Sequence, residues 1–166
     1  MRVTEIEVHE IALDYDAERV HELSHYHFSQ RRTIYVAHTD SGLVGLGESG
    51  STVAQEVIDR YIGTNPFDWV GDETSLGLGT AMYDLMGKAA GVPVYKLIGP
   101  KRRSWVPVAG WTVATDPGRM ARAVENLAGQ GHTWMKFHLS PFENVFDQTE
   151  AMQAVAPPGF KLHYDF

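Results

Sequence analysis

Three strand-like segments, separated by helix-like stretches, occupy the second half of the sequence. They cover residues 106–111, 134–139 and 161–166, and their starts lie 28 and 27 residues apart. Strands that alternate with helices at this spacing are typical of parallel βα units. A closed (β/α)8 barrel uses about 250 residues, roughly 31 for each unit. We therefore expect residues 104–166 to form only the first three strands of a TIM-type barrel, in the order β-α-β-α-β.

The first half of the sequence has a different pattern. Apolar and polar residues alternate in part over residues 3–13, as in a half-buried strand. Two further strand-like runs, 33–39 and 43–48, flank the turn sequence at residues 40–42, which is Asp-Ser-Gly. A strand, a tight turn and a returning strand predict a hairpin. Together the three runs predict an antiparallel meander.

Helical patterns follow this meander. Thr52 opens a stretch that fits a capping box, with apolar residues on one face up to Ile62. A longer helix is predicted over residues 73–90 and ended by Gly91 and Pro93. We therefore predict an α+β N-terminal capping domain, with the antiparallel three-stranded meander plus helices, over residues 1–103. The partial barrel domain follows over 104–166.

Charge and composition exclude several classes of partner. The formal net charge is −7, which argues against nucleic acid as a partner. The chain has no cysteine, so neither disulfides nor thiolate metal sites can stabilise it. It has no apolar run of 18 residues and no signal-peptide core at its start. We expect a soluble, cytoplasmic protein without a membrane partner.

Polar side chains stand at the carboxyl ends of the predicted strands. Because side chains alternate along a strand, Lys136 and His138 share one face, as do Lys161, His163 and Asp165. Barrel interiors are normally apolar, and barrel enzymes carry their working groups at these strand ends. Such residues either mark an active site or satisfy one another as buried pairs. The combination Lys-x-His with a carboxylate on the next strand favours an active site.

These residue types suit proton abstraction next to a carboxylate group. The enediolate that forms carries two negative charges, and a divalent cation with a second cationic group can stabilise it. Asp165 can supply one oxygen ligand to Mg²⁺, and Lys136 can supply the positive charge. One aspartate cannot hold the metal alone, so the remaining ligands are expected beyond residue 166.

Residues 81–99 read AMYDLMGKAAGVPVYKLIG, and this stretch is the most specific motif of the chain. It looks like the capping-domain helix, with its exit, of the mandelate racemase/muconate lactonizing enzyme family of the enolase superfamily, which the sequence resembles. The run GLGE at 45–48 resembles the end of its third strand, and HYDF at 163–166 resembles its Asp-x-Asn strand up to the residue before the Asn. The resemblance extends over essentially the whole chain.

The resemblance implies a Mg²⁺-dependent enzyme that acts on a small carboxylate. Asp165 matches the family's first metal ligand, and Lys136 and His138 match its catalytic Lys-x-Lys motif, with His in the second place. An ordinary lysine pKa is about 10.4 and that of histidine about 6.5, so His138 could be a base, a general acid for a leaving hydroxyl or a substrate contact. We therefore favour dehydration of an acid sugar by a lyase. Racemisation, epimerisation and cycloisomerisation stay open.

The same resemblance makes residues 14–29 a loop that closes over the substrate. His25 and Tyr26 in this loop, and Trp111 at the tip of the first barrel strand, are then candidate substrate contacts. A zinc site at His21, His25 and His27 is the alternative for this loop, but its acidic residues favour a solvated segment.

A hypothesis of another class is that the chain as it stands is a non-catalytic fragment or an oligomerisation module. Three parallel strands with an unpaired edge leave apolar surface and backbone groups exposed. We expect the 166-residue chain alone to bind Mg²⁺ poorly, to be inactive and to aggregate or dimerise. The full-length form is expected to be a homo-oligomer.

Overall fold

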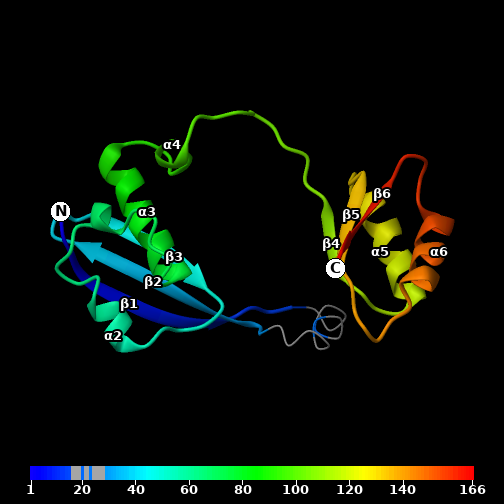
Figure 1. The fold of residues 1–166 in the computed structure, drawn as a ribbon, viewed down its shortest axis with the longest axis horizontal. Coiled ribbons are helices and arrows are strands. Elements are labelled where there is room, and N and C mark those ends of the chain that lie inside the picture. Colours follow the sequence, from blue (N-terminus) through cyan, green and yellow to red (C-terminus); the bar gives the residue numbers. More distant parts are fainter. Residues whose placement is uncertain (16–19, 21–22, 24–28) are drawn as a thin grey trace. The chain divides into compact units, whose positions relative to one another are not determined.

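The computed structural model describes residues 1–15, 20, 23 and 29–166 (Figure 1). The chain divides into two compact units. Unit 1 contains Met1–Tyr15 and Ser29–Ser104, and unit 2 contains Trp105–Phe166. No helix among the described residues has the length and apolar character that crossing a bilayer requires.

Unit 1 is built on the predicted meander. Its strands are β1 (Val3–Ala12), β2 (Arg31–Thr39) and β3 (Val44–Ser49), in the order β1-β2-β3, and both pairings are antiparallel. The hairpin turn between β2 and β3 is confirmed, with Gly42 at φ 80°, a backbone conformation that glycine adopts without strain. The sheet thus has β1 and β3 as its two edges.

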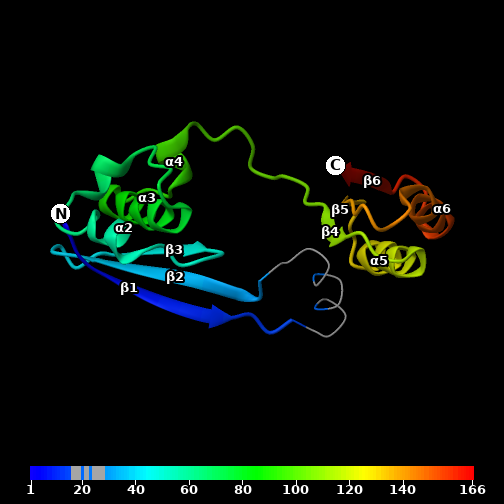
Figure 2. The same ribbon diagram turned by 60° about the horizontal axis from the view of Figure 1, so that its bottom comes forward.

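The helices of unit 1 lie on one face of this sheet (Figure 2). They are α2 (Gln55–Asp59), the 3-10 helix η1 (Pro66–Trp69), α3 (Leu76–Ala90) and α4 (Tyr95–Ile98). The predicted capping box at Thr52 is wrong, because α2 begins after Ala54 and has no side-chain cap. The Thr52 hydroxyl contacts the Thr33 hydroxyl and donates to Glu10 of β1 instead, at 2.8 and 2.9 Å.

The long helix α3 forms the core of unit 1. Ser75 caps its first turn by accepting from the Leu78 N–H, and Gly91 ends it in the left-handed conformation. Its inner face is fully buried against Tyr35 and Ala37 of β2. Close packing accounts for Gly77 in this helix, since a Cβ there would lie 2.6 Å from the Tyr35 ring. At Gly79 a Cβ would meet only ordinary contact distances, so packing does not explain that glycine.

Unit 2 alternates strands and helices as predicted. Its elements are β4 (Gly110–Val113), α5 (Pro117–Gly129), β5 (Trp134–His138), α6 (Val145–Val155) and β6 (Lys161–Asp165). The strands pair in parallel in the order β4-β5-β6. Helices α5 and α6 cover one face of this sheet (Figures 1 and 2). Between helices and sheet lies a core that includes Met120, Val124, Met135, Phe137 and Met152.

Helices α5 and α6 have well-defined start and packing contacts. Asp116 caps α5 by accepting from the Arg119 N–H at 3.0 Å, and Pro117 follows at the first helical position. In α6, Met152 is buried, and the Thr149 hydroxyl lies 2.9 Å from the Tyr164 hydroxyl of β6.

The first strand of unit 2 is shorter and later than predicted. It begins at Gly110 instead of residue 106, and Val106 and Val108 are 60% and 73% exposed. Pro107 has no N–H to donate to a sheet ladder, so the alternating valines around it do not make a paired strand. Trp111 is therefore the second residue of β4 and not its tip.

Candidate active site

The strand register of unit 2 brings the polar candidate residues onto one face of the sheet. Trp111 pairs with Lys136, Lys136 pairs with His163, and His138 pairs with Asp165. Residues that pair across parallel strands point to the same side, and side chains alternate along each strand. The alternate residues belong to the core under α5 and α6. We call the opposite side, which carries these five residues, the polar face.

Lys136 and Asp165 meet on the polar face. The Lys136 Nζ lies 2.5 Å from the Asp165 Oδ2, a charge-assisted contact that runs diagonally from β5 to β6. Both side chains are partly exposed, at 28% and 43%. The same ammonium lies 5.9 Å from the centre of the Trp111 ring, within the range of a cation–π contact. The expected convergence of an ammonium and a carboxylate on neighbouring strands is therefore present.

His138 has a defined ring orientation at the end of β5. Its Nδ1 lies 2.9 Å from the backbone oxygen of Leu139, and a carbonyl oxygen can only accept a hydrogen bond. Nδ1 therefore carries the hydrogen, and Nε2 is the nitrogen that can accept a proton in the neutral ring. The backbone hydrogen bonds between β5 and β6 continue past His138, because the Leu139 N–H donates to the backbone oxygen of Asp165 at 3.0 Å. This bond fixes the backbone beside both candidate residues.

The Asp165 carboxylate is electrostatically stabilised in its charged form. The hydrogen bond from Lys136 lowers the pKa of Asp165 below its ordinary value, and the nearby charge of Lys136 and of the His138 and His163 rings acts in the same direction, while burial opposes it. The carboxylate is therefore charged to a lower pH than an ordinary aspartate.

We expect this pKa to depend on Lys136. Because the pKa of Asp165 is lowered in the folded chain, its ionised form stabilises the fold at any pH above the unfolded-state pKa. This stabilisation is lost as the pH falls through the folded-state pKa. In an NMR titration of the Asp165 carboxyl carbon, Lys136→Met should move the pKa upward, toward the range of an ordinary aspartate. An unchanged titration curve would contradict the ion pair.

Two further residues lie on the polar face, His163 beside the ion pair and Trp134 at the amino end of β5. The Trp134 and His163 rings stack with a centroid distance of 6.1 Å and an interplanar angle of 5°. His163 pairs with Lys136 in the register, so it borders the ion pair directly. The strand alternation that selected Lys136 also includes Trp134 two residues earlier, and this signal could have identified it.

A third residue, Gln148 of α6, gave no signal in the sequence. Its Nε2 donates to the backbone oxygen of Thr115 at 2.6 Å, within the buried interior. Thr115 lies two residues after the end of β4, so this bond holds the loop at the carboxyl end of that strand against α6. The Gln148 Oε1 is buried and has no partner within the described part of the chain.

Of the candidate residues, only Asp165 offers a ligand that suits Mg²⁺. Asp165 presents a carboxylate, the oxygen donor that Mg²⁺ prefers, at the carboxyl end of β6. Among residues 1–15, 20, 23 and 29–166, no group of three His, Cys, Asp or Glu side chains could hold a metal ion. His25 and Tyr26, and with them the alternative zinc site at His21, His25 and His27, lie outside the described residues.

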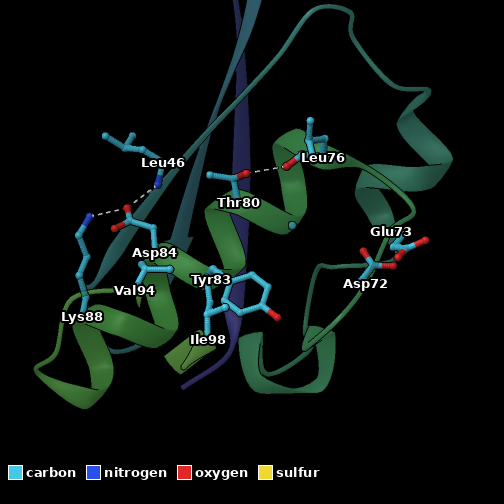
Figure 3. Close-up of a pocket in the computed structure, with 11 residues that line it drawn as sticks. Leu46, Asp72, Glu73, Leu76, Thr80, Tyr83, Asp84, Lys88, Val94 and Ile98 are labelled. Atoms are coloured by element: carbon cyan, nitrogen blue, oxygen red, sulfur yellow. Dashed lines mark hydrogen bonds and ion pairs between the residues drawn. The ribbon is translucent and has the colours of Figure 1, made fainter. Parts of the chain in front are cut away.

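Unit 1 contains an apolar groove that is separate from these residues. It has a volume of about 930 Å³ and runs along α3, between the β3 edge and α4 (Figure 3). Its lining includes Leu46, Leu76, Tyr83, Val94 and Ile98. None of the candidate residues on the polar face lines it. Of the charged side chains in its lining, Asp84 and Lys88 bond the backbone of β3 and one another, and Asp72 bonds Tyr61 and Thr74. We place the candidate chemistry at the strand ends of unit 2.

Sequence comparisons identify relatives of two activities. The D-galactonate dehydratase of Xanthomonas oryzae pv. oryzae (strain PXO99A) is 24% identical over 162 residues, which cover 82% of this chain and 42% of the dehydratase. The N-succinyl-L-Arg/Lys racemase of Bacillus cereus is 26% identical over 182 residues, covering 93% of this chain and 48% of the racemase. The chain spans less than half the length of these curated relatives. No protein-family model matches it.

Solved structures share the fold over nearly the whole chain. The dipeptide epimerase of Enterococcus faecalis V583, in complex with Mg and the dipeptide L-Leu-L-Tyr, matches with a TM-score of 0.76 and 21% identity, covering 99% of this chain and 53% of the epimerase. A member of the enolase superfamily from Roseovarius nubinhibens ISM matches with a TM-score of 0.72 and 20% identity, covering 99% and 50%. The sequence relatives and the shared fold together support the resemblance drawn from the sequence: over most of its length the chain is similar to about half of the D-galactonate dehydratase, of the N-succinyl-L-Arg/Lys racemase and of solved enolase-superfamily members.

Proposed function

We propose that this chain forms the N-terminal part of a Mg²⁺-dependent lyase that abstracts the α-proton of a carboxylate substrate and eliminates water. The observation that carries the proposal is the 2.5 Å contact between Lys136 and Asp165 beside His138, at the carboxyl ends of two parallel strands. Strand ends of this kind hold the chemistry of barrel enzymes. Residues 1–103 would act as the capping domain and residues 104–166 as the first part of the barrel.

Each of the three residues has a role that its chemistry supports. Removal of the α-proton places additional negative charge on the substrate carboxylate, and the Lys136 ammonium stabilises that charge. The His138 Nε2 can take a proton from carbon or give one to a leaving hydroxyl, because Nδ1 is held by the Leu139 carbonyl. Asp165 would be one ligand of Mg²⁺, which would supply further positive charge to the intermediate.

Dehydration of an acid sugar is the activity that we favour. An imidazole such as that of His138 can serve as a general acid, which is what elimination of a hydroxyl group requires. The similarity to D-galactonate dehydratase, whose name specifies an acid-sugar substrate, supports the same activity. A small carboxylate of this class is the proposed substrate.

Racemisation or epimerisation is the second candidate. The match to the N-succinyl-L-Arg/Lys racemase covers 93% of this chain, more than the match to the dehydratase. In both candidates the first step is removal of the α-proton, so Lys136, His138 and Asp165 would have the same initial roles. The two candidates differ in the fate of the intermediate, which either loses a hydroxyl group or takes back a proton.

The test uses a chain that extends this sequence to the length of its relatives. It is incubated with Mg²⁺, D2O and a panel of acid sugars and N-acylated amino acids, and the products are analysed by NMR and mass spectrometry. Formation of a keto-deoxy acid supports dehydration. Deuterium at the α-carbon of recovered substrate, without loss of water, supports racemisation or epimerisation.

Two variants test the residue roles in this assay. His138→Ala and Asp165→Ala should each abolish measurable turnover, whereas the 166-residue chain alone should bind Mg²⁺ poorly and show none. Activity that survives both substitutions would disprove the assigned roles. Homo-oligomerisation of the full-length form stays a prediction that light scattering of the same sample would check.

A further inference from the structure

The Lys136 ammonium binds the carboxylate that the proposed function assigns to the metal ion. The Lys136 Nζ lies 2.5 Å from the Asp165 Oδ2, at the carboxyl ends of β5 and β6. A charge-assisted contact of this length uses a lone pair of the oxygen. Mg²⁺ also needs a lone pair of a carboxylate oxygen, because it binds its ligands directly. The ammonium and a metal ion therefore require the same group.

Sharing of the carboxylate between the two cations is unfavourable. Asp165 has a second oxygen, but a metal ion bound there would leave two cations on one carboxylate, whose single negative charge cannot neutralise both. The Lys136 and Asp165 side chains are 28% and 43% exposed, so water screens the repulsion between the cations only in part. Binding of the metal ion should therefore weaken the contact between Lys136 and Asp165.

The polar face offers the ammonium a second contact away from the carboxylate. Trp111 of β4 pairs with Lys136 of β5, and the centre of its ring lies 5.9 Å from the Lys136 Nζ. An indole ring attracts a cation through its face, and the four-carbon stem of lysine is flexible. The apolar core of unit 2 lies on the other side of the sheet. The ammonium can thus leave Asp165 without entering an apolar environment.

We propose that Mg²⁺ and the Lys136 ammonium compete for the Asp165 carboxylate, and that binding of the metal ion frees the ammonium for the carboxylate of the substrate. This inference rests on the proposed function, since it takes Asp165 as a metal ligand and a small carboxylate as the substrate. Coupling between two binding events is reciprocal. Removal of the ammonium must therefore strengthen metal binding by the factor by which its presence weakens it.

Calorimetric titration of Mg²⁺ into the full-length chain, without substrate, tests the competition. Lys136→Met should lower the Kd for Mg²⁺ about tenfold, because the metal ion no longer has to displace a charge-assisted hydrogen bond. Lys136→Arg keeps the positive charge and can also bond a carboxylate, so it should give no such gain. Lys136→Gln is neutral and serves if the methionine variant does not fold. An unchanged Kd in a folded neutral variant would overturn the proposal.

Lys161→Met is the matched control for the loss of charge. Lys161 lies on the same face of β6 as Asp165, but at the amino end of the strand, where it pairs with Trp134. Its removal takes the same charge from the polar face, yet the Kd for Mg²⁺ should change by less than about twofold, because separated and exposed charges are screened. An equal gain in affinity from both methionine variants would reveal an effect of net charge and would contradict the competition.

A double-mutant cycle separates this inference from the proposed function. Asp165→Asn should weaken Mg²⁺ binding, and Lys136→Met should give no gain in affinity when it is added to Asp165→Asn, because the shared carboxylate is gone. Metal affinity that Asp165→Asn leaves unchanged would overturn the proposed metal ligand and this inference with it. Affinity that falls in Asp165→Asn but does not rise in Lys136→Met would overturn this inference alone. The measurements need no turnover, so their outcome does not depend on which substrate the full-length chain converts.

Discussion

Lys136→Met in the full-length chain should lower kcat by about 10²- to 10³-fold, the usual effect of removing one group that stabilises charge in a transition state. The Lys136 ammonium already lies 2.5 Å from Asp165 and next to Trp111, so methionine would remove the positive charge from the proposed site without a large change in volume. Steady-state kinetics with Mg²⁺, on whichever acid sugar the full-length chain converts, would measure the loss.

Lys161→Met is the matched control for this prediction. Lys161 is on the same face of β6 as Asp165 but at the opposite end of the strand, level with Trp134. The loss of a lysine there should change kcat by less than about twofold, since barrel chemistry is confined to the carboxyl ends of the strands. Similar losses for the two variants would place the effect in folding and not in the chemistry of Lys136.

Gly47→Ala should destabilise unit 1 by about 3 kcal/mol or more, at the upper end of the range for overpacked sites. The added Cβ would lie 1.9 Å from the Gly77 oxygen and 2.9 Å from the Ala81 nitrogen. Both are backbone atoms of α3, so no side chain can move aside, and the whole helix would have to leave its place over β3. Urea denaturation followed by circular dichroism would measure the loss.

Gly50→Ala is the comparison for this substitution. It is close to the same strand, and a Cβ there would have no heavy atom within 4 Å. Gly50→Ala should change the urea midpoint of unfolding only slightly. If both variants lowered this midpoint by a similar amount, close packing at Gly47 would not be the cause of the destabilisation. Gly47→Ala should also expose the β3 edge, because it moves Asp84 and Lys88 away from Val44 and Leu46.

Local sequence signals predicted the helices and strands whose stabilising contacts join residues close together in the sequence. Asp116 and Pro117 start α5, and Gly91 ends α3, because a cap or a left-handed residue acts within one helical turn. Thr52 carried an equally good cap pattern, but its hydroxyl contacts Thr33 and Glu10 on strands that are distant in sequence. These tertiary hydrogen bonds replaced the local one, and no pattern around residue 52 encodes them.

The site was predictable in its residue types and only partly in its geometry. Alternation placed Lys136 and His138 on one face of a strand, and this followed from the sequence because the period of two is a local property. The position of Trp111 was predicted wrongly, since the start of β4 depends on where its backbone finds a partner in β5. Gln148 was missed because a helical glutamine becomes a buried donor only through the packing of α6 on the loop after β4.

The sequence by itself determined the order of strands and helices, the two kinds of sheet, and the face of β5 that carries Lys136 and His138. The tertiary structure alone decided that the Lys136 ammonium reaches Asp165, 29 positions away, and that Asp84 and Lys88 bond the edge of β3. The physical reason is the same in both cases. The alternation of side chains along a strand and the capping of a helix depend on near neighbours in the chain. The strand register and the distance between a helix and a sheet are fixed by the packing of side chains from distant segments.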